Sequence, residues 1–285
     1  MLNQIDGAYV AAEIRMIRQV KECSILIVEG VNDEKIFSRF IDGDKCEIEI
    51  AFNKSNALDA LDLLEDEGFP GVVAVVDADF DRVLGRSRHL ENLCMTETHD
   101  LDLVVLLSSA FDFYIKEYCD NEKLHKSFEG DPKKLRTKIF NACLPIAYCR
   151  LASERRGMNI SFKDLNYGEF IDKFTLEIDK MTLFSIVLSK SNVNYDVNIL
   201  SRLVDLEESY NFDLLQLVNG HDATAVLGIA LQEMVGRRRE VHTWSREVES
   251  ALRLAFDWES MTRTEIYEAL KGWEVSSAPY IIFRQ

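Results

Sequence analysis

Short apolar runs alternate with segments of helical period in the first part of the chain. Apolar runs at 24–30, 46–52, 71–77 and 93–97 predict strands. The segments between them, 6–22, 32–41 and 55–66, place apolar residues at helical spacing, and a further helical segment begins at residue 100. This alternation predicts a parallel sheet with helices on both faces, so the expected fold class is α/β.

The individual runs differ in how deeply they are expected to lie. The runs at 24–30 and 71–77 are apolar almost throughout, which is typical of strands buried on both faces of a parallel sheet. The run at 46–52 alternates isoleucine with glutamate, which favours a more exposed position in the sheet.

The pattern changes near residue 110, after which nearly every segment is helical in period. Examples are 111–119, 133–151, 167–189, 197–207, 223–236 and 244–256. We therefore expect two domains, a sheet domain at 1–110 and a mostly α-helical second domain at 111–285 that binds substrate or partner.

Composition supports a folded chain and adds one constraint on binding. The 285 residues are 47% hydrophobic with only 13 Gly and 4 Pro, which excludes a disordered or collagen-like protein. The net charge of −16 excludes a uniformly basic coat for nucleic acid. Residues 1–110 hold 10 basic and 22 acidic side chains, whereas 121–160 hold 9 basic and 4 acidic ones. The acidity is thus concentrated in the expected sheet domain.

The cysteines and the apolar runs bear on the compartment. The six cysteines contain no Cys-x-x-Cys pair and no spacing typical of zinc, so we expect reduced thiols. No apolar run approaches the roughly 20 residues of a membrane helix. The N-terminal residues show no basic stretch followed by an apolar one. The expected location is the cytoplasm, without a membrane partner.

Carboxylates follow two of the predicted strands. Glu29 precedes a glycine at the end of the first strand, and Asp77, Asp79 and Asp81 follow the third. The carboxyl ends of parallel strands share one rim, where ligands of open α/β sheets bind. Carboxylates gathered there need a cation, and Mg²⁺ (or Mn²⁺) prefers such oxygen ligands. The alternative to a metal site is an ordinary structural role for these carboxylates, at the start of a loop or as a helix cap.

A strand ending in Glu-Gly, a further β-α unit and a strand ending in Asp-x-Asp together resemble the Toprim domain. The matching stretches are 25–30 and 73–79, and the resemblance extends over about 24–108. It implies a magnesium-dependent enzyme that cuts or joins phosphodiesters. Glu29 would be an acid/base or metal ligand, and Asp77 and Asp79 would bind metal.

A narrower resemblance involves shorter motifs at 28–33, 96–102 and 219–222. These resemble stand-alone Toprim nucleases with a helical C-terminal half, a group that includes the AriB-type effectors of the PARIS anti-phage defence system. That resemblance implies endoribonuclease attack on tRNA after release from a partner ABC-type ATPase. The chain has no Walker A motif, so any ATP-driven step would belong to the partner.

Other residues are candidates for supporting roles, each with an ordinary structural alternative. Asp100 and Asp102 could complete a metal site, or could begin a helix that Thr98 caps. Lys35 could act at the catalytic site as a cation near phosphate, or be a solvated helix lysine. His221 and Asp222 could contribute to the active cleft, or cap a helix.

Two sets of basic residues are candidates for nucleic-acid binding. One set directly follows the aspartates and the other lies on an amphipathic helix: Arg82, Arg86 and Arg88; Lys133, Lys134, Arg136 and Lys138. The first set could instead offset the acidic rim, and the second could be a solvated face.

Two hypotheses from different classes follow. The first is a metal-dependent Toprim nuclease acting on RNA or on DNA, with tRNA as the expected substrate and a homodimer as the expected active form. The second is a non-catalytic Toprim-like subunit that docks on an ATPase or another partner. A phosphoacceptor receiver is disfavoured, because Glu29-Gly30 would have no role there.

Overall fold

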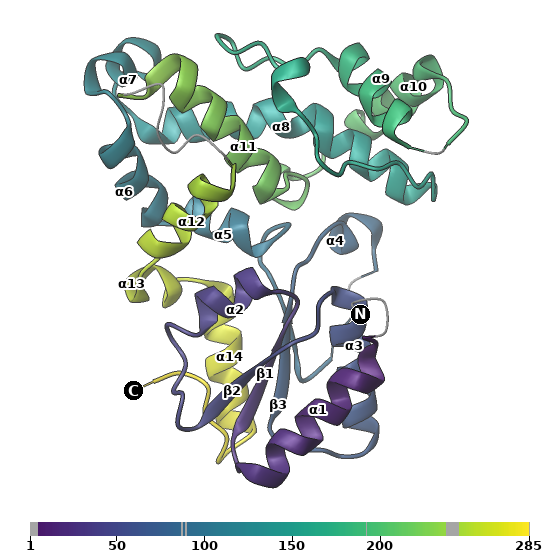
Figure 1. The fold of residues 1–285 in the computed structure, drawn as a ribbon, viewed down its shortest axis with the longest axis vertical. Coiled ribbons are helices and arrows are strands. Elements are labelled where there is room, and N and C mark those ends of the chain that lie inside the picture. Colours follow the sequence, from purple (N-terminus) through teal and green to yellow (C-terminus); the bar gives the residue numbers. More distant parts are fainter. Residues whose placement is uncertain (1–4, 87, 89, 192, 238–244, 285) are drawn as a thin grey trace. The chain divides into compact units, whose positions relative to one another are not determined.

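The computed structural model describes residues 5–86, 88, 90–191, 193–237 and 245–284. It shows an α/β protein with a four-stranded parallel sheet and mostly helical structure elsewhere, so the expected fold class is confirmed at that level (Figure 1). The chain divides into two compact units, one comprising 1–78, 87–104 and 256–285 and the other 79–86 and 105–255.

The sheet of the first unit has the strand order β2-β1-β3-β4, with every pairing parallel. The strands are β1 (Ser24–Val28), β2 (Cys46–Ile50), β3 (Val72–Val76) and β4 (Leu93–Met95). All four predicted strands are present. The fully apolar runs became the central strands β1 and β3, and the alternating run became the edge strand β2, as predicted.

Helices α1 (Gly7–Val20) and α3 (Lys54–Asp66) pack together against one face of this sheet (Figure 1). Their buried side chains surround those of Ile25 and Ile27 on β1 and of the residues on β3 that face the same way. The two helices approach so closely that a Cβ atom on Gly7 would lie 2.4 Å from Cβ of Asp59. Glycine is therefore required at position 7 for this packing.

The C-terminal segment belongs to the first unit. Helices α13 (Trp258–Met261) and α14 (Glu265–Ser276) are followed by a strand-like bridge between Phe283 and Ile41. The ring of Trp258 packs against those of Phe40 and Phe283, and α14 lies on the opposite side of the sheet from α1 (Figure 1). The sequence places this segment in the helical part, because helical period does not reveal what a helix packs against.

The second unit is built from helices. Its main helices are α6 (Ser109–Tyr118), α7 (Asn121–Phe128), α8 (Pro132–Arg155), α9 (Lys180–Lys190), α10 (Val197–Glu208), α11 (Gly220–Ala230) and α12 (Ser245–Ala255). The predicted helix at 223–236 begins earlier and ends in a π-helical turn, Leu231–Val235. Three shorter helices each come after a strand: α2 (Val31–Phe37) follows β1 in the first unit, α4 (Asp81–Leu84) follows β3, and α5 (Leu101–Leu107) follows β4.

The predicted helix at 167–189 is wrong over its first half. The structure has a 3₁₀ turn at Tyr167–Glu169 and a bridge between Ile171 and Ile178, and α9 begins only at Lys180. The Asp172 side chain accepts hydrogen bonds from backbone N–H groups at 174 and 175, which offers that backbone an alternative to helix. Within the described residues, no helix is long and apolar enough to cross a membrane.

Candidate active site at the carboxyl ends of the strands

Two of the predicted site residues lie at the carboxyl ends of β1 and β3 and are joined by a hydrogen bond. Glu29 follows β1 and Asp77 follows β3, and these strands are neighbours in the sheet. The Glu29 carboxylate accepts a hydrogen bond from the Asp77 backbone N–H, with 2.7 Å between Oε1 and N. Both residues are half-buried. The structure thus brings together the pair that the spacing of the motifs predicts.

Glu29 is held at a sharp strand-to-helix turn. Helix α2 begins two residues later, and Asp33 in its first turn accepts a hydrogen bond from the Gly30 N–H at 2.8 Å. This contact satisfies a backbone donor at the start of the helix and fixes the direction in which the chain leaves β1.

The Asp77–Ala78 segment is tied to three other elements. Oδ1 of Asp77 accepts from the Leu101 N–H at the start of α5 (2.9 Å), and the Ala78 N–H donates to Oγ1 of Thr96 beyond β4 (2.9 Å). The Asp77 carbonyl accepts from Nζ of Lys54 at 2.6 Å. The carboxylate of Asp77 is therefore held in one orientation, and its charge lies favourably at a helix N-terminus.

Asp79 and Asp81 do not continue the orientation of Asp77. The strand ends at Val76, Asp79 has a left-handed backbone with φ of 47°, and Asp81 begins α4. The expectation that the three aspartates point the same way, as in an extended segment, is wrong because the chain turns after Ala78. Arg86 lies near Asp81, with 3.3 Å between Nε and Oδ1.

Beyond β4, the polar residues are buried and engaged with the backbone. Asp100 accepts from the Leu103 N–H at 2.8 Å, so Asp100, rather than Thr98, caps α5. The Thr98 hydroxyl donates to the Asp100 carbonyl at 2.9 Å. His99 is also buried, and Asp102 is half-buried in the first turn of α5.

The residues at the strand ends suit a magnesium ion in type. Glu29 and Asp77 supply carboxylate oxygens, and Mg²⁺ is usually held by one or two carboxylates with water and substrate phosphate completing its shell. In the part of the chain that the structure describes, no group of three or more His, Cys, Asp or Glu side chains is arranged to hold a metal ion.

The arginines after the aspartates have protein partners. Arg82 donates to the Gln216 side chain at 3.2 Å, and Arg86 contacts both Asp81 and Glu154. Arg88 lies 3.1 Å from Asp62. These pairings match the alternative in which the arginines offset nearby acidic groups. A role in nucleic-acid binding stays a prediction.

On α8, the basic residues differ from one another. The Arg136 guanidinium donates to the Leu106 and Leu107 carbonyls (3.2 and 3.3 Å) at the end of α5, and burial lowers its pKa. Lys134 pairs with Glu129, whereas Lys133 is exposed and Lys138 is half-exposed. Arg136 therefore has a structural role, since it satisfies the last carbonyls of a helix.

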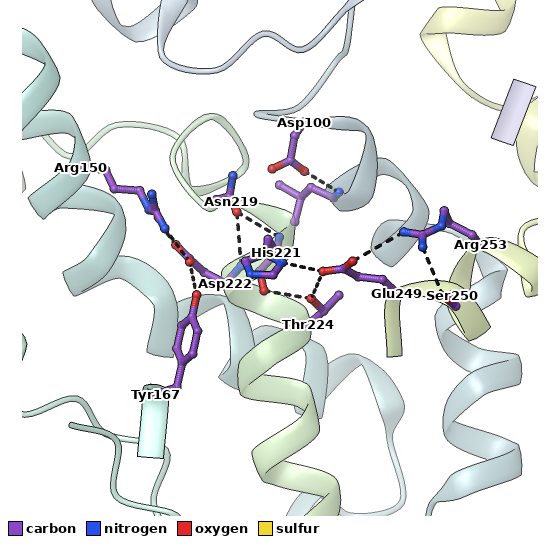
Figure 2. A network of polar contacts seen from close by, with 11 residues as sticks. Asp100, Arg150, Tyr167, Asn219, His221, Asp222, Thr224, Glu249, Ser250 and Arg253 are labelled. Carbon is purple, nitrogen blue, oxygen red and sulfur yellow. Dashed lines mark hydrogen bonds and ion pairs between the residues drawn. The ribbon is translucent and has the colours of Figure 1, made fainter. Parts of the chain in front are cut away.

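The second unit contains a separate buried network, shown in Figure 2. Asp222 in the first turn of α11 accepts two hydrogen bonds from Arg150 (3.0 and 2.9 Å) and one from the Tyr167 hydroxyl. Burial and the Asp222 carboxylate raise the pKa of Tyr167, so its hydroxyl stays a donor. This arrangement accounts for Asp222 as a structural residue.

Beside it, His221 is bonded to a buried carboxylate. Its Nδ1 lies 2.6 Å from Oε1 of Glu249, which also accepts from the Thr224 hydroxyl at 3.2 Å (Figure 2). The His221 side chain is 56% exposed, whereas that of Glu249 is 7% exposed. A buried carboxylate orients an exposed imidazole here, and a role for His221 in catalysis stays a prediction.

The lysine that contacts the candidate site differs from the one predicted from the sequence. Lys35 is exposed on α2, whereas Lys54, which the sequence reasoning missed, reaches the end of β3. The available signal was that Lys54 follows the second predicted strand closely, as Glu29 follows the first.

No protein-family model matches the chain, and no curated protein matches it in sequence. The function is therefore argued from the residues and geometry of the site.

Proposed function

We propose that the protein is a metal-dependent nuclease of Toprim type that cleaves phosphodiesters in RNA, with tRNA as its substrate. The single observation that carries the proposal is the hydrogen bond from the Asp77 N–H to the Glu29 carboxylate, which ties the two residues at the neighbouring strand ends together. As in the narrower resemblance, the chain would act as a toxic effector restrained by an ABC-type ATPase partner.

Glu29 and Asp77 would hold Mg²⁺ or Mn²⁺, and Asp79 follows in the chain as the second aspartate of the motif. When bound, such an ion polarises a phosphodiester and lowers the pKa of a water molecule. The residues themselves supply a fixed pair of carboxylates, each oriented by a backbone N–H. Because this orientation is already present, little reorganisation is needed for binding.

The test compares purified full-length protein with its Glu29→Gln variant on bulk tRNA, mRNA and plasmid DNA, with Mg²⁺, Mn²⁺ or EDTA. We expect EDTA-sensitive cleavage of tRNA that falls by at least about 100-fold in the variant, the scale of a lost acid–base or ligand group. Glu47→Gln is the matched control, because Glu47 lies on β2 of the same sheet and pairs with Lys21.

Cleavage that persists in the Glu29→Gln variant would contradict the mechanism. Selective cleavage of plasmid DNA would show that DNA, rather than RNA, is the substrate. A restrained enzyme would cleave nothing yet bind metal. Absence of both cleavage and a Mn²⁺-induced rise in melting temperature would instead favour a non-catalytic subunit that docks on a partner.

A further inference from the structure

Lys54 links two strand ends across the strand that carries Glu29. It is the first residue of α3, four residues after the end of β2, and its side chain is half-buried. Its Nζ lies 2.6 Å from the Asp77 carbonyl oxygen and 3.4 Å from that of Ala78, beyond β3. Because β1 lies between β2 and β3 in the sheet, this contact spans the end of β1.

We infer that Lys54 is the positioning residue of the proposed metal centre, an inference that rests on the proposed function. Its ammonium group donates to the backbone carbonyls of the two successive residues Asp77 and Ala78. These contacts set the rotation of the segment, and with it the direction of the Asp77 carboxylate. They also fix the point from which the chain turns toward Asp79.

The contacts of Lys54 complement those of Glu29 and Thr96. Glu29 and Thr96 accept from the N–H groups of Asp77 and Ala78, so they hold the donor side of the segment. Lys54 holds the carbonyl side of both residues, and a charged donor makes stronger hydrogen bonds than a neutral one.

The charge of Lys54 also suits this place. A neutral side chain could satisfy backbone carbonyls, whereas a half-buried ammonium group is costly to desolvate unless the surroundings favour it. Glu29 and Asp77 bring negative charge to the same strand ends. The lysine therefore both orients the segment and offsets part of the repulsion between two carboxylates.

The test measures Mn²⁺ binding by the full chain from the rise in melting temperature during a Mn²⁺ titration. Lys54→Met should weaken Mn²⁺ binding by about 10-fold or more, the scale of losing a residue that orients metal ligands. Lys54→Arg, which keeps charge and donors, should restore most of the binding. Lys45→Met is the control, because Lys45 precedes β2 at the opposite end of the sheet and contacts Asp42.

The metal-induced shift separates positioning from a merely structural role, which would lower the melting temperature without metal and leave the Mn²⁺ affinity unchanged. If Lys54→Met does not fold, Lys54→Gln decides, because it keeps a polar side chain with an amide donor group and loses the charge. The same loss of affinity is expected. Wild-type affinity in the folded methionine or glutamine variant would overturn this inference alone. A wild-type protein without any Mn²⁺ response would overturn the proposed function with it.

Discussion

Replacing the buried Asp222 by asparagine should lower the stability of the protein, without a direct effect on catalysis. The Asp222 side chain is 1% exposed and that of Arg150 is 22% exposed. The guanidinium of Arg150 makes two hydrogen bonds to the carboxylate and lies over the ring of Phe162, with 4.5 Å to the ring centroid. The Asp222→Asn variant leaves this guanidinium without its counter-charge in a poorly solvated place.

The expected magnitude follows from the contacts. Removing one partner of a buried ion pair costs about 3–5 kcal/mol. Asparagine keeps one oxygen that can accept from Arg150, so we expect the lower end of that range, about 3 kcal/mol. Tyr167→Phe removes only the hydroxyl donor to the same carboxylate and should cost about 1.5 kcal/mol, the lower end for a hydrogen bond to a charged group.

Urea denaturation of both variants, followed by circular dichroism of the helices, measures these free energies. The double variant should lose less free energy of unfolding than the sum of the single variants, because Arg150 and Tyr167 both donate to the Asp222 carboxylate. A loss below about 0.5 kcal/mol in Asp222→Asn, typical of a surface substitution, would refute the reasoning. Unchanged stability with lost tRNA cleavage would instead assign Asp222 to the catalytic machinery.

The remaining predictions concern two other carboxylates. The pKa of Glu49 is raised from 4.5 to about 8. Burial is the main cause, and the hydrogen bond and the negative charge of Glu13 add to it. The folded state therefore keeps a proton that the unfolded state has lost, so stability should fall as pH rises from 4.5 to about 8. Glu49→Gln should flatten that part of the profile in urea denaturation; an equally steep fall in the variant would contradict the assignment. Glu207, with a side chain 0% exposed, is paired with Arg155 and Arg156. Glu207→Ala should cost about 3–5 kcal/mol by calorimetry, and an unchanged transition would show that the pairs contribute no net stability.

The sheet could be predicted because burial leaves a mark on sequence. The central strands β1 and β3 are apolar almost throughout, since both of their faces are covered, and the edge strand β2 alternates. Parallel pairing then places Glu29 and Asp77 at one rim without knowledge of the register. In contrast, the fate of 167–189 depended on local hydrogen bonds of Asp172 that compete with helix, and period alone does not show this competition.

The two lysines show where sequence reasoning about a site stops. Lys35 and Lys54 each lie on the helix that follows a strand, so spacing ranks them alike. Lys35 is exposed, whereas Lys54 reaches the Asp77 carbonyl across an intervening strand. The reach depends on where helix α3 lies relative to the sheet. The Asn53 cap marks where α3 begins, whereas its packing against α1 and the sheet leaves no motif.

The contacts that assemble the candidate site share one property that explains this difference. Glu29 and Thr96 accept from backbone N–H groups, and Lys54 donates to backbone carbonyls. Every residue other than proline carries the same backbone donor and acceptor, so the receiving position leaves no signature in the sequence. A motif can therefore reveal which side chain is able to orient a neighbour, while the strand order decides which neighbour it orients. At this rim the order β2-β1-β3 directs both Glu29 and Lys54 to Asp77, and the orientation of its carboxylate depends on both.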